Sequence, residues 1–216
     1  MHVAVTGGSG QLGTQLLRKL ARSRAVREIV SIDLAPPRVA SAKIRHVACD
    51  VRDPELGRHL EGCEAVVHLA ARVTQAGDAE LASVNVDGSR NVMESAARAG
   101  ASQLLVASTE AAYGVAGQGP APITEHAARV RADALAYAAS KYDLERDVDA
   151  FEADHPGVAV CRLRPSLLFG ARMEHPFGRM LLAGFCPGAP FRLAVVWDED
   201  VAAAFALAVE RRARGA

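Results

Sequence analysis

The amino-acid sequence predicts a protein of the α/β class, built on a mainly parallel sheet. Short apolar runs of strand length recur along the chain, and segments with helical spacing of apolar residues separate them. The first of these runs leads directly into three closely spaced glycines and then into a helical pattern. A length of 216 residues is ample for one domain with a packed core.

Six strands are expected, and each is a short run rich in apolar residues. Strand, helical segment and strand alternate, so the sheet is expected to be doubly wound. The runs lie at residues 3–6, 28–33, 44–49, 65–70, 103–108 and 158–163.

Three helices are justified most directly. Leucines at helical spacing follow the first strand, at positions 12, 16, 17 and 20. Residues 81–99 predict a long helix that ends before Gly100, a common residue just after a helix. Residues 198–212 predict a final amphipathic helix, whereas residues 113–131 and 170–190 are rich in glycine, alanine or proline and predict loops or irregular structure.

Composition excludes several classes of partner. The 25 basic residues balance 25 acidic ones, so neither a nucleic acid nor a membrane is an expected partner. The sequence contains no apolar run of about 18 residues and no secretion signal, which predicts a cytoplasmic protein. Cys49, Cys63, Cys161 and Cys186 lack metal-type spacing, so we expect reduced thiols and no bound metal.

The glycines Gly7, Gly10 and Gly13 lie between the first strand and the first helix. In that context Gly7 can form a tight turn, Gly10 can let the main chain approach a pyrophosphate, and Gly13 can let helix and strand pack closely. The free amides and the positive end of the helix dipole would meet the phosphate charge. Ordinary turn chemistry is the alternative explanation.

Asp33 ends the second strand, where an acidic side chain can accept both hydroxyls of an adenosine ribose. Because a carboxylate there would repel a 2′-phosphate, the sequence predicts NAD rather than NADP as cofactor. The nearby Arg38 leaves the alternative open, since it could accommodate such a phosphate if the loop turned back.

Tyr137 and Lys141 stand four residues apart. On a helix this spacing places their Cβ atoms about 5–6 Å apart on one face. A neighbouring ammonium favours the phenolate, which predicts a proton-transfer pair. The alternative is an ordinary pair on a helix surface.

These motifs resemble the extended short-chain dehydrogenase/reductase family, and specifically its NAD-dependent epimerase/dehydratase group. The resemblance covers residues 3–170, in the family's order. It rests on TGGSGQLG at 6–13, CDVRD at 49–53, VVHLAA at 66–71, NVDG at 85–88, STEAAYG at 108–114, YxxxK at 137–141 and RLRP at 162–165 with FG at 169–170.

The resemblance implies a doubly wound (Rossmann) sheet with a C-terminal substrate lobe, and it assigns residues to the binding of NAD. Asp50 and Val51 would hold the adenine edge, and Asn85 would lie near the catalytic face. The alternative roles are a loop cap for Asp50, a polar helix residue for Asn85, and core packing for the run Leu69, Ala70 and Ala71. The full predicted cofactor set is Gly7, Gly10, Gln11, Leu12, Gly13, Asp33, Asp50, Val51, Leu69, Ala70, Ala71, Asn85, Tyr137, Lys141 and Pro165.

The resemblance also implies a catalytic set of Thr109, Tyr137 and Lys141. Tyr137 would be the general acid/base, while Lys141 would lower its pKa and bond the nicotinamide ribose. Thr109 would fix the reacting oxygen while a hydride moves between the cofactor and a substrate carbon.

For five other residues the sequence gives simpler expectations. His68 is expected to be a core histidine, and burial is expected for Trp197, the sole tryptophan. Tyr113 could wall the pocket or simply pack. Arg162 and Arg164 flank a strand end, where solvent exposure and a substrate phosphate are both open.

The chain departs from the family pattern in three ways. The family's sugar epimerases carry an aromatic-Asn segment after the sixth strand, whereas this chain has Pro-Ser-Leu-Leu at 165–168, which weakens the case for a UDP-galactose-type substrate. Dehydratases of the family carry Asp-Glu after the active Thr, whereas this chain has Glu110 and Ala111, which makes dehydration by that mechanism doubtful. Only a short stretch is left for a lobe, so we expect an NAD-binding domain over residues 1–170 and a minimal or truncated substrate-binding lobe over 171–216.

The expected function is an NAD-dependent oxidoreductase or epimerase that acts at a hydroxyl/carbonyl carbon of a nucleotide sugar or of a small alcohol or ketone. One rival is a non-catalytic NAD-binding sensor or interaction protein. Another is a steroid- or flavonoid-type reductase of the same superfamily. The expected partner is a small-molecule substrate, and the resemblance implies a possible homodimer that packs the Tyr-Lys helix.

Overall fold

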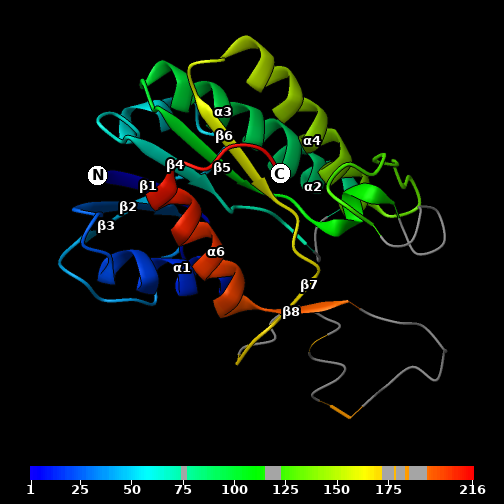
Figure 1. The fold of residues 1–216 in the computed structure, drawn as a ribbon, viewed down its shortest axis with the longest axis horizontal. Coiled ribbons are helices and arrows are strands. Elements are labelled where there is room, and N and C mark those ends of the chain that lie inside the picture. Colours follow the sequence, from blue (N-terminus) through cyan, green and yellow to red (C-terminus); the bar gives the residue numbers. More distant parts are fainter. Residues whose placement is uncertain (74–76, 115–122, 172–177, 179–182, 185–193) are drawn as a thin grey trace.

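The computed structural model describes residues 1–73, 77–114, 123–171, 178, 183–184 and 194–216. Its main sheet has six parallel strands in the order β3-β2-β1-β4-β5-β6 (Figure 1). The strands are β1 (His2–Thr6), β2 (Glu28–Asp33), β3 (Ile44–Ala48), β4 (Ala65–His68), β5 (Gln103–Ala107) and β6 (Ala159–Leu163). The predicted doubly wound α/β fold is therefore confirmed.

The strand order reverses between β1 and β4, which pair side by side. At the end of β1, Thr6 pairs with Ile32 of β2 and with His68 of β4. Because all the strands are parallel, their carboxyl ends meet at one edge of the sheet. Ligands bind at such a reversal point in open α/β sheets.

Helices cover both faces of the sheet. On one face lie α1 (Gln11–Arg22) and α6 (Asp198–Arg211), and on the other lie α2 (Asp78–Ala82), α3 (Gly88–Arg98) and α4 (Ala136–Asp154) (Figure 1). Two short 3₁₀ helices, η1 (Pro54–His59) and η3 (Glu110–Tyr113), complete the connections. None of the described helices combines the length and apolar character needed to cross a membrane.

Each face of the sheet has its own apolar core. Leu16, Leu17 and Leu20 of α1 pack with Phe205 of α6 on one side, all of them fully buried. On the other side, Val92 of α3 and Leu144 of α4 pack with strand residues. The leucine spacing read from the sequence thus identifies the buried stripe of α1.

The helix expected at residues 81–99 differs from the prediction in its centre. A π-helical turn, η2 (Ser83–Asp87), joins α2 to α3. The end is as expected, because Gly100 has φ of +76° after the last turn of α3. A π turn adds one residue to the helix turn and rotates the side chains that follow it.

The C-terminal part also differs from expectation. A separate two-stranded sheet pairs β7 (Leu167–Phe169) with β8 (Val195–Trp197), and α6 packs beside α1 in the main fold. The expected burial of Trp197 is wrong, since 49% of its surface is exposed. Trp197 belongs to β8 of the small sheet, and it is a member of neither apolar core of the described residues.

Candidate active site

The glycine loop forms a tight turn between β1 and α1. Gly7 has φ of +75°, its N–H donates to Ile32 O at 2.9 Å, and its O accepts from Gly10 N at 3.2 Å. A Cβ on Gly13 would lie 2.1 Å from Gly7 O, so only glycine fits there. A Cβ on Gly7 would lie 2.6 Å from Ala70 N. The loop after β4 therefore lies directly against the glycine turn.

A cavity of about 180 Å³ opens beside this loop at the end of β2. Asp33 lies in its wall, and its carboxylate accepts hydrogen bonds from Ser9 N at 3.0 Å and from Ala35 N at 3.3 Å. The predicted residues that line this cavity are Gly7, Gly10, Asp33, Asp50, Val51, Leu69, Ala70 and Ala71.

Asp50 forms a contact that the sequence did not predict. Its carboxylate lies 2.6 Å from the guanidinium of Arg52 and also accepts from Arg52 N at 2.8 Å. The hydrogen bonds and charge of Arg52 hold the pKa of Asp50 below its usual range. Arg52 and Arg72 join Cys49 in the same cavity wall.

A larger cavity of about 590 Å³ lies on the other side of the glycine loop. Gly7, Gly10, Leu69 and Ala71 line both cavities. The two cavities therefore form one trough that crosses the glycine turn. Predicted residues found only in the larger cavity are Gln11, Leu12, Gly13, Thr109, Tyr137, Lys141 and Pro165.

Tyr137 and Lys141 lie in the first two turns of α4. The Lys141 ammonium is 5.8 Å from the Tyr137 ring centre and donates to Ala107 O at 2.8 Å. Burial raises the pKa of Tyr137 to about 12, and a hydrogen bond with Thr109 opposes this only partly. Burial also lowers the pKa of Lys141 to about 8, against a smaller opposing effect of Glu145.

The lowering of the Tyr137 pKa by Lys141 stays a prediction. The spacing on the helix is as predicted, and in the structure the partial burial of Tyr137 is the largest cause of its raised pKa. The sequence pattern shows a cation nearby and carries no information on how deeply the phenol is buried. In this geometry Tyr137 is a proton donor at neutral pH.

Thr109 lies between β5 and η3. Its hydroxyl accepts from Ala111 N at 3.3 Å and caps η3, while Thr109 also lines the larger cavity beside Tyr137. Glu110, the next residue, faces a different cavity of about 490 Å³, where burial raises its pKa. The single acidic residue after Thr109 therefore lines a neighbouring cavity and not the one that holds Tyr137.

Asn85 lines neither half of the trough. Its Oδ1 accepts from Arg72 N at 2.7 Å, and its Nδ2 donates to Arg72 O at 2.8 Å and to Ser140 Oγ at 3.1 Å. Only 1% of the residue is exposed. Asn85, which lies in the π turn η2, therefore connects the loop after β4 to α4 by hydrogen bonds. No contact with the trough among the described residues supports its predicted role as a cofactor ligand.

His68 is a core histidine, as expected. Its Nδ1 lies 2.7 Å from Thr6 Oγ1, and its Nε2 lies 2.8 Å from Ser89 Oγ. Burial, aided by the charge of Lys141, lowers the pKa of His68 to about 3. Its ring is neutral and links β1, β4 and α3 beneath the glycine turn.

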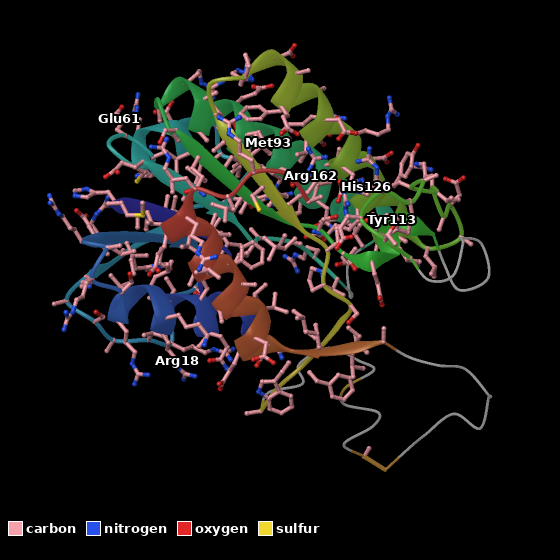
Figure 2. All side chains as sticks on the ribbon, in the orientation of Figure 1. Arg18, Glu61, Met93, Tyr113, His126 and Arg162 are labelled. Carbon is pink, nitrogen blue, oxygen red and sulfur yellow. The ribbon has the colours of Figure 1, made fainter. Side chains whose placement is uncertain are left out.

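Arg162 and Arg164 are neither solvent-exposed nor free for a substrate phosphate. Both point to Glu145 of α4, and Arg164 makes bonds of 2.7 and 2.8 Å to that carboxylate. Burial raises the pKa of Glu145, but these bonds and charges outweigh burial and lower it to about 2. Arg164 also donates to the Tyr113 hydroxyl at 2.7 Å. Tyr113 is buried and also lines the 490 Å³ cavity, and its side chain lies in the same part of the molecule as that of Arg162 (Figure 2).

Sequence reasoning missed part of the lining. Val73, Ser166, Leu167 and Leu168 line the larger cavity, and they follow β4 and β6 at the same sheet edge as the motifs. The sign of these residues in the sequence is that they follow predicted strands, whose carboxyl ends lie at the edge of the sheet that holds the site. Within the described residues no group of three His, Cys, Asp or Glu could hold a metal; Cys49, Cys63 and Cys161 are free and buried, and Cys186 lies outside the described residues.

Comparison with known proteins agrees with this geometry. The sequence profile of the NAD dependent epimerase/dehydratase family matches residues 3–186. Sterol demethylase protein B of Methylococcus capsulatus is 31% identical, over 100% of this chain and 68% of its own length. Ceramide reductase of Caulobacter vibrioides is 31% identical, over 93% of this chain and 58% of its own length.

Solved structures show the same fold. DesIV, a dTDP-glucose 4,6-dehydratase from Streptomyces venezuelae solved with NAD bound, superposes with a TM-score of 0.80 at 26% identity, over 97% of this chain and 72% of that one. WbmH of Bordetella bronchiseptica, solved with NAD⁺, gives a TM-score of 0.82 at 26% identity, over 97% and 72%.

The chain spans about half the length of the first curated relatives it matches, 49% and 51%. The family match nevertheless covers most of the chain, from β1 to beyond β7. With the glycine turn, the acidic residue after β2 and the Tyr-Lys pair arranged along one trough, this protein belongs to the NAD dependent epimerase/dehydratase family.

Proposed function

We propose that the protein binds NAD along the trough and acts as an oxidoreductase or epimerase at a hydroxyl/carbonyl carbon. One observation carries this proposal: Thr109, Tyr137 and Lys141 line the same cavity as Gly7 and Gly10 of the glycine turn. A dinucleotide whose pyrophosphate lies on the turn reaches both Asp33 and the Tyr-Lys pair. NAD-bound structures of relatives with the same fold support the choice of cofactor.

The glycine turn fits the pyrophosphate by its geometry. The turn lies at the N-terminus of α1, where free amides and the helix dipole favour negative charge. No side chain intrudes at Gly7 or Gly10, so the backbone can approach the phosphates. Asp33 would accept the adenosine ribose hydroxyls, and Asp50 with Val51 would contact the adenine edge.

The chemistry divides between cofactor and protein. When bound, NAD supplies the hydride acceptor or donor. Tyr137 holds the proton that a substrate carbonyl oxygen gains on reduction, since its phenol is protonated at neutral pH. Thr109 positions that oxygen by a hydrogen bond, and Lys141 supplies positive charge beside the proton-transfer site.

The segments around β7 and β8 are proposed to form the substrate-facing lobe. Leu167 and Leu168 of β7 line the larger cavity opposite the glycine turn. Residues 1–170, together with α6, would then hold the cofactor. A dehydratase activity of the family type is not proposed, because Glu110 faces the neighbouring cavity and Ala111 has no ionisable group.

The test is Tyr137→Phe, with Tyr142→Phe on the same helix as the matched control. NADH oxidation is followed with a panel of ketones, and NAD⁺-dependent conversion with a panel of alcohols and nucleotide sugars. In Tyr137→Phe, kcat is expected to fall at least about 100-fold, while the Kd for NAD is expected to stay within about twofold of the parent's value.

Two results would count against the proposal. Absence of NAD binding by the folded parent would remove the function altogether. Binding of NAD without turnover on any substrate, or equal turnover in Tyr137→Phe, would favour the rival reading of a non-catalytic NAD-binding sensor.

A further inference from the structure

Beyond Thr109, Tyr137 and Lys141, the described wall of the larger cavity is mainly apolar, and its other polar side chains, Gln11, Ser108 and Ser166, are uncharged. Val73 follows β4, Pro165 follows β6, and Leu167 and Leu168 belong to β7; all four line this cavity. Leu12 closes the floor from the first turn of α1. A substrate whose reacting oxygen lies at Thr109 and Tyr137 therefore has most of its remaining atoms against uncharged and mainly apolar side chains.

Positive charge is scarce in this wall. Of the residues that the structure describes in the larger cavity, Lys141 alone is charged, and its ammonium is buried and bonded to Ala107 O at 2.8 Å. A nucleoside diphosphate carries charge that proteins neutralise with Arg or Lys. The described lining offers its phosphates no such partner beyond the cation that serves Tyr137.

The described arginines of the two neighbouring cavities are paired with carboxylates. In the smaller cavity Arg52 lies 2.6 Å from Asp50, and Arg72 lies 3.4 Å from Glu80. Arg162 and Arg164 are bound to Glu145, and Arg162 also bonds Glu152 at 2.5 Å. They line the 490 Å³ cavity, which also contains the carboxylates of Glu110 and Glu125. A diphosphate in that cavity would meet negative charge as well as already paired arginines.

Apolar surface continues outward from the cavity along the small sheet. In β7 and β8, Leu167 pairs with Val195 and Phe169 pairs with Trp197. Residues paired in register on neighbouring strands share a face, and alternate residues repeat it. Val195 is 51% exposed and Trp197 49%, so one face of the sheet presents hydrocarbon to solvent next to the cavity wall.

Resting on the function proposed above, we propose that this site takes an uncharged, largely apolar alcohol or ketone and not a nucleoside diphosphate sugar. The carbonyl end would lie at Thr109 and Tyr137, and the hydrocarbon body along Val73, Leu167 and Leu168. The exposed face of β7 and β8 extends this surface for a substrate longer than the cavity.

The experiment uses N-phenyl-1-naphthylamine, a neutral dye whose fluorescence rises in apolar surroundings. It is titrated into the NAD-saturated protein, and UDP-glucose is then added to millimolar concentration. A saturable rise that UDP-glucose does not reverse is expected. Val73→Lys places an ammonium in the wall and is expected to weaken dye binding at least tenfold; Val73 is half-exposed, so the fold tolerates the change.

Two further variants complete the design. Leu168→Lys changes the opposite part of the wall and is expected to act in the same direction. Leu207→Lys is the matched control, because Leu207 is a 45% exposed leucine of α6 that lines none of the three cavities described above. It is expected to leave dye affinity within twofold.

Three results would each overturn the inference. The first is the absence of saturable dye binding, and the second is displacement of the dye by UDP-glucose. The third is a dye affinity that is the same in the parent as in Val73→Lys and Leu168→Lys. Failure of the proposed function is seen separately, as loss of NAD binding in calorimetry or as unchanged turnover in Tyr137→Phe. A protein that binds NAD and also binds UDP-glucose would retain the proposed function and lose only the apolar substrate.

Discussion

The Lys141 ammonium lies 5.8 Å from the ring centre of Tyr137 and donates its hydrogen bond to the main chain of β5. Lys141 is buried and Tyr137 is partly buried, and removal of water disfavours the charged form of either group. The phenol therefore keeps its proton, and the ammonium loses its proton more readily than a surface lysine does. At neutral pH the pair therefore holds its protons on both the phenol and the ammonium.

The first prediction concerns the ionisation of Tyr137. Because the pKa of Tyr137 lies at about 12, no tyrosinate from this residue should form between pH 7 and 10 in the protein without cofactor. The measurement is the ultraviolet difference spectrum between the parent and Tyr137→Phe over this range. A tyrosinate signal that grows near pH 8 would show that Lys141, and not burial, controls the phenol.

The second prediction concerns stability and pH. The folded-state pKa of Lys141 is about 8 and the unfolded value is near 10.5, so between these values the unfolded chain binds more protons. The free energy of unfolding of the parent should therefore rise from pH 8 to pH 10 relative to Lys141→Met, by up to about 3 kcal/mol. Urea unfolding of both proteins at each pH measures the difference, and a flat difference would contradict the assignment.

The third prediction separates two glycines of the turn. In Gly13→Ala the new methyl would lie 2.1 Å from Gly7 O and 2.8 Å from Gly8 Cα, so a loss of about 1–3 kcal/mol in unfolding free energy is expected. In Gly10→Ala the nearest atom is Gly7 O at 3.4 Å, so stability should change by less than about 1 kcal/mol.

The two variants should rank differently in their affinity for NAD than in their unfolding free energy. Gly10 lines both cavities, so a methyl there would keep a pyrophosphate from the main chain and raise the Kd for NAD about tenfold or more. Calorimetry with NAD, performed on folded Gly10→Ala, measures this. An unchanged Kd would show that the phosphates do not lie against Gly10.

The fourth prediction concerns Asp33. In Asp33→Asn the side chain keeps its size but loses the charge that would repel a 2′-phosphate. The Kd for NAD is expected to rise about tenfold, and the preference for NAD over NADP should fall. Asp154→Asn, an exposed carboxylate at the end of α4, is the control and should change neither. Tighter binding of NADP than NAD by the parent would refute the predicted cofactor.

The fifth prediction concerns the clamp made by Asn85. Asn85→Ala removes three hydrogen bonds and leaves Arg72 N, Arg72 O and Ser140 Oγ without this partner, at an expected cost of about 2–4 kcal/mol. Asn85→Asp keeps the shape but sets an oxygen against Arg72 O, so it should be no better tolerated than Ala. Urea unfolding of both variants decides, and a stable Asn85→Asp would contradict the clamp.

The sequence predicted the sheet because its signals are local. Each of the six strands is a short apolar run, and β2 agrees with the structure from Glu28 to Asp33. The glycine spacing and the Tyr-Lys spacing are equally local, and both place their residues on the trough. Trp197 was misjudged because its burial depends on which residues surround β8, which no local pattern records.

Interactions between distant residues could not be read in the same way. The partner of Arg162 and Arg164 could not be read from local spacing, because Glu145 lies on the preceding helix and faces them only after β6 joins the sheet. Asn85 stands in a segment whose periodicity predicts a regular helix, whereas the structure has a π turn there, and the partners of its amide, Arg72 and Ser140, are distant in sequence. The pKa of Tyr137 depends on depth, which is also a property of the finished fold.

The buried imidazole of His68 has one consistent direction of proton donation. Ser89 Oγ gives its own hydrogen to Asn85 O, so it must receive from Nε2–H, and Nδ1 must in turn receive from the Thr6 hydroxyl. A second proton on the ring would force the Thr6 hydroxyl to rotate, in the residue that directly precedes the glycine turn. Because burial lowers the pKa of His68 to about 3, this second proton is gained only near pH 3, and the ring holds Thr6 in one orientation beside the glycine turn at every milder pH.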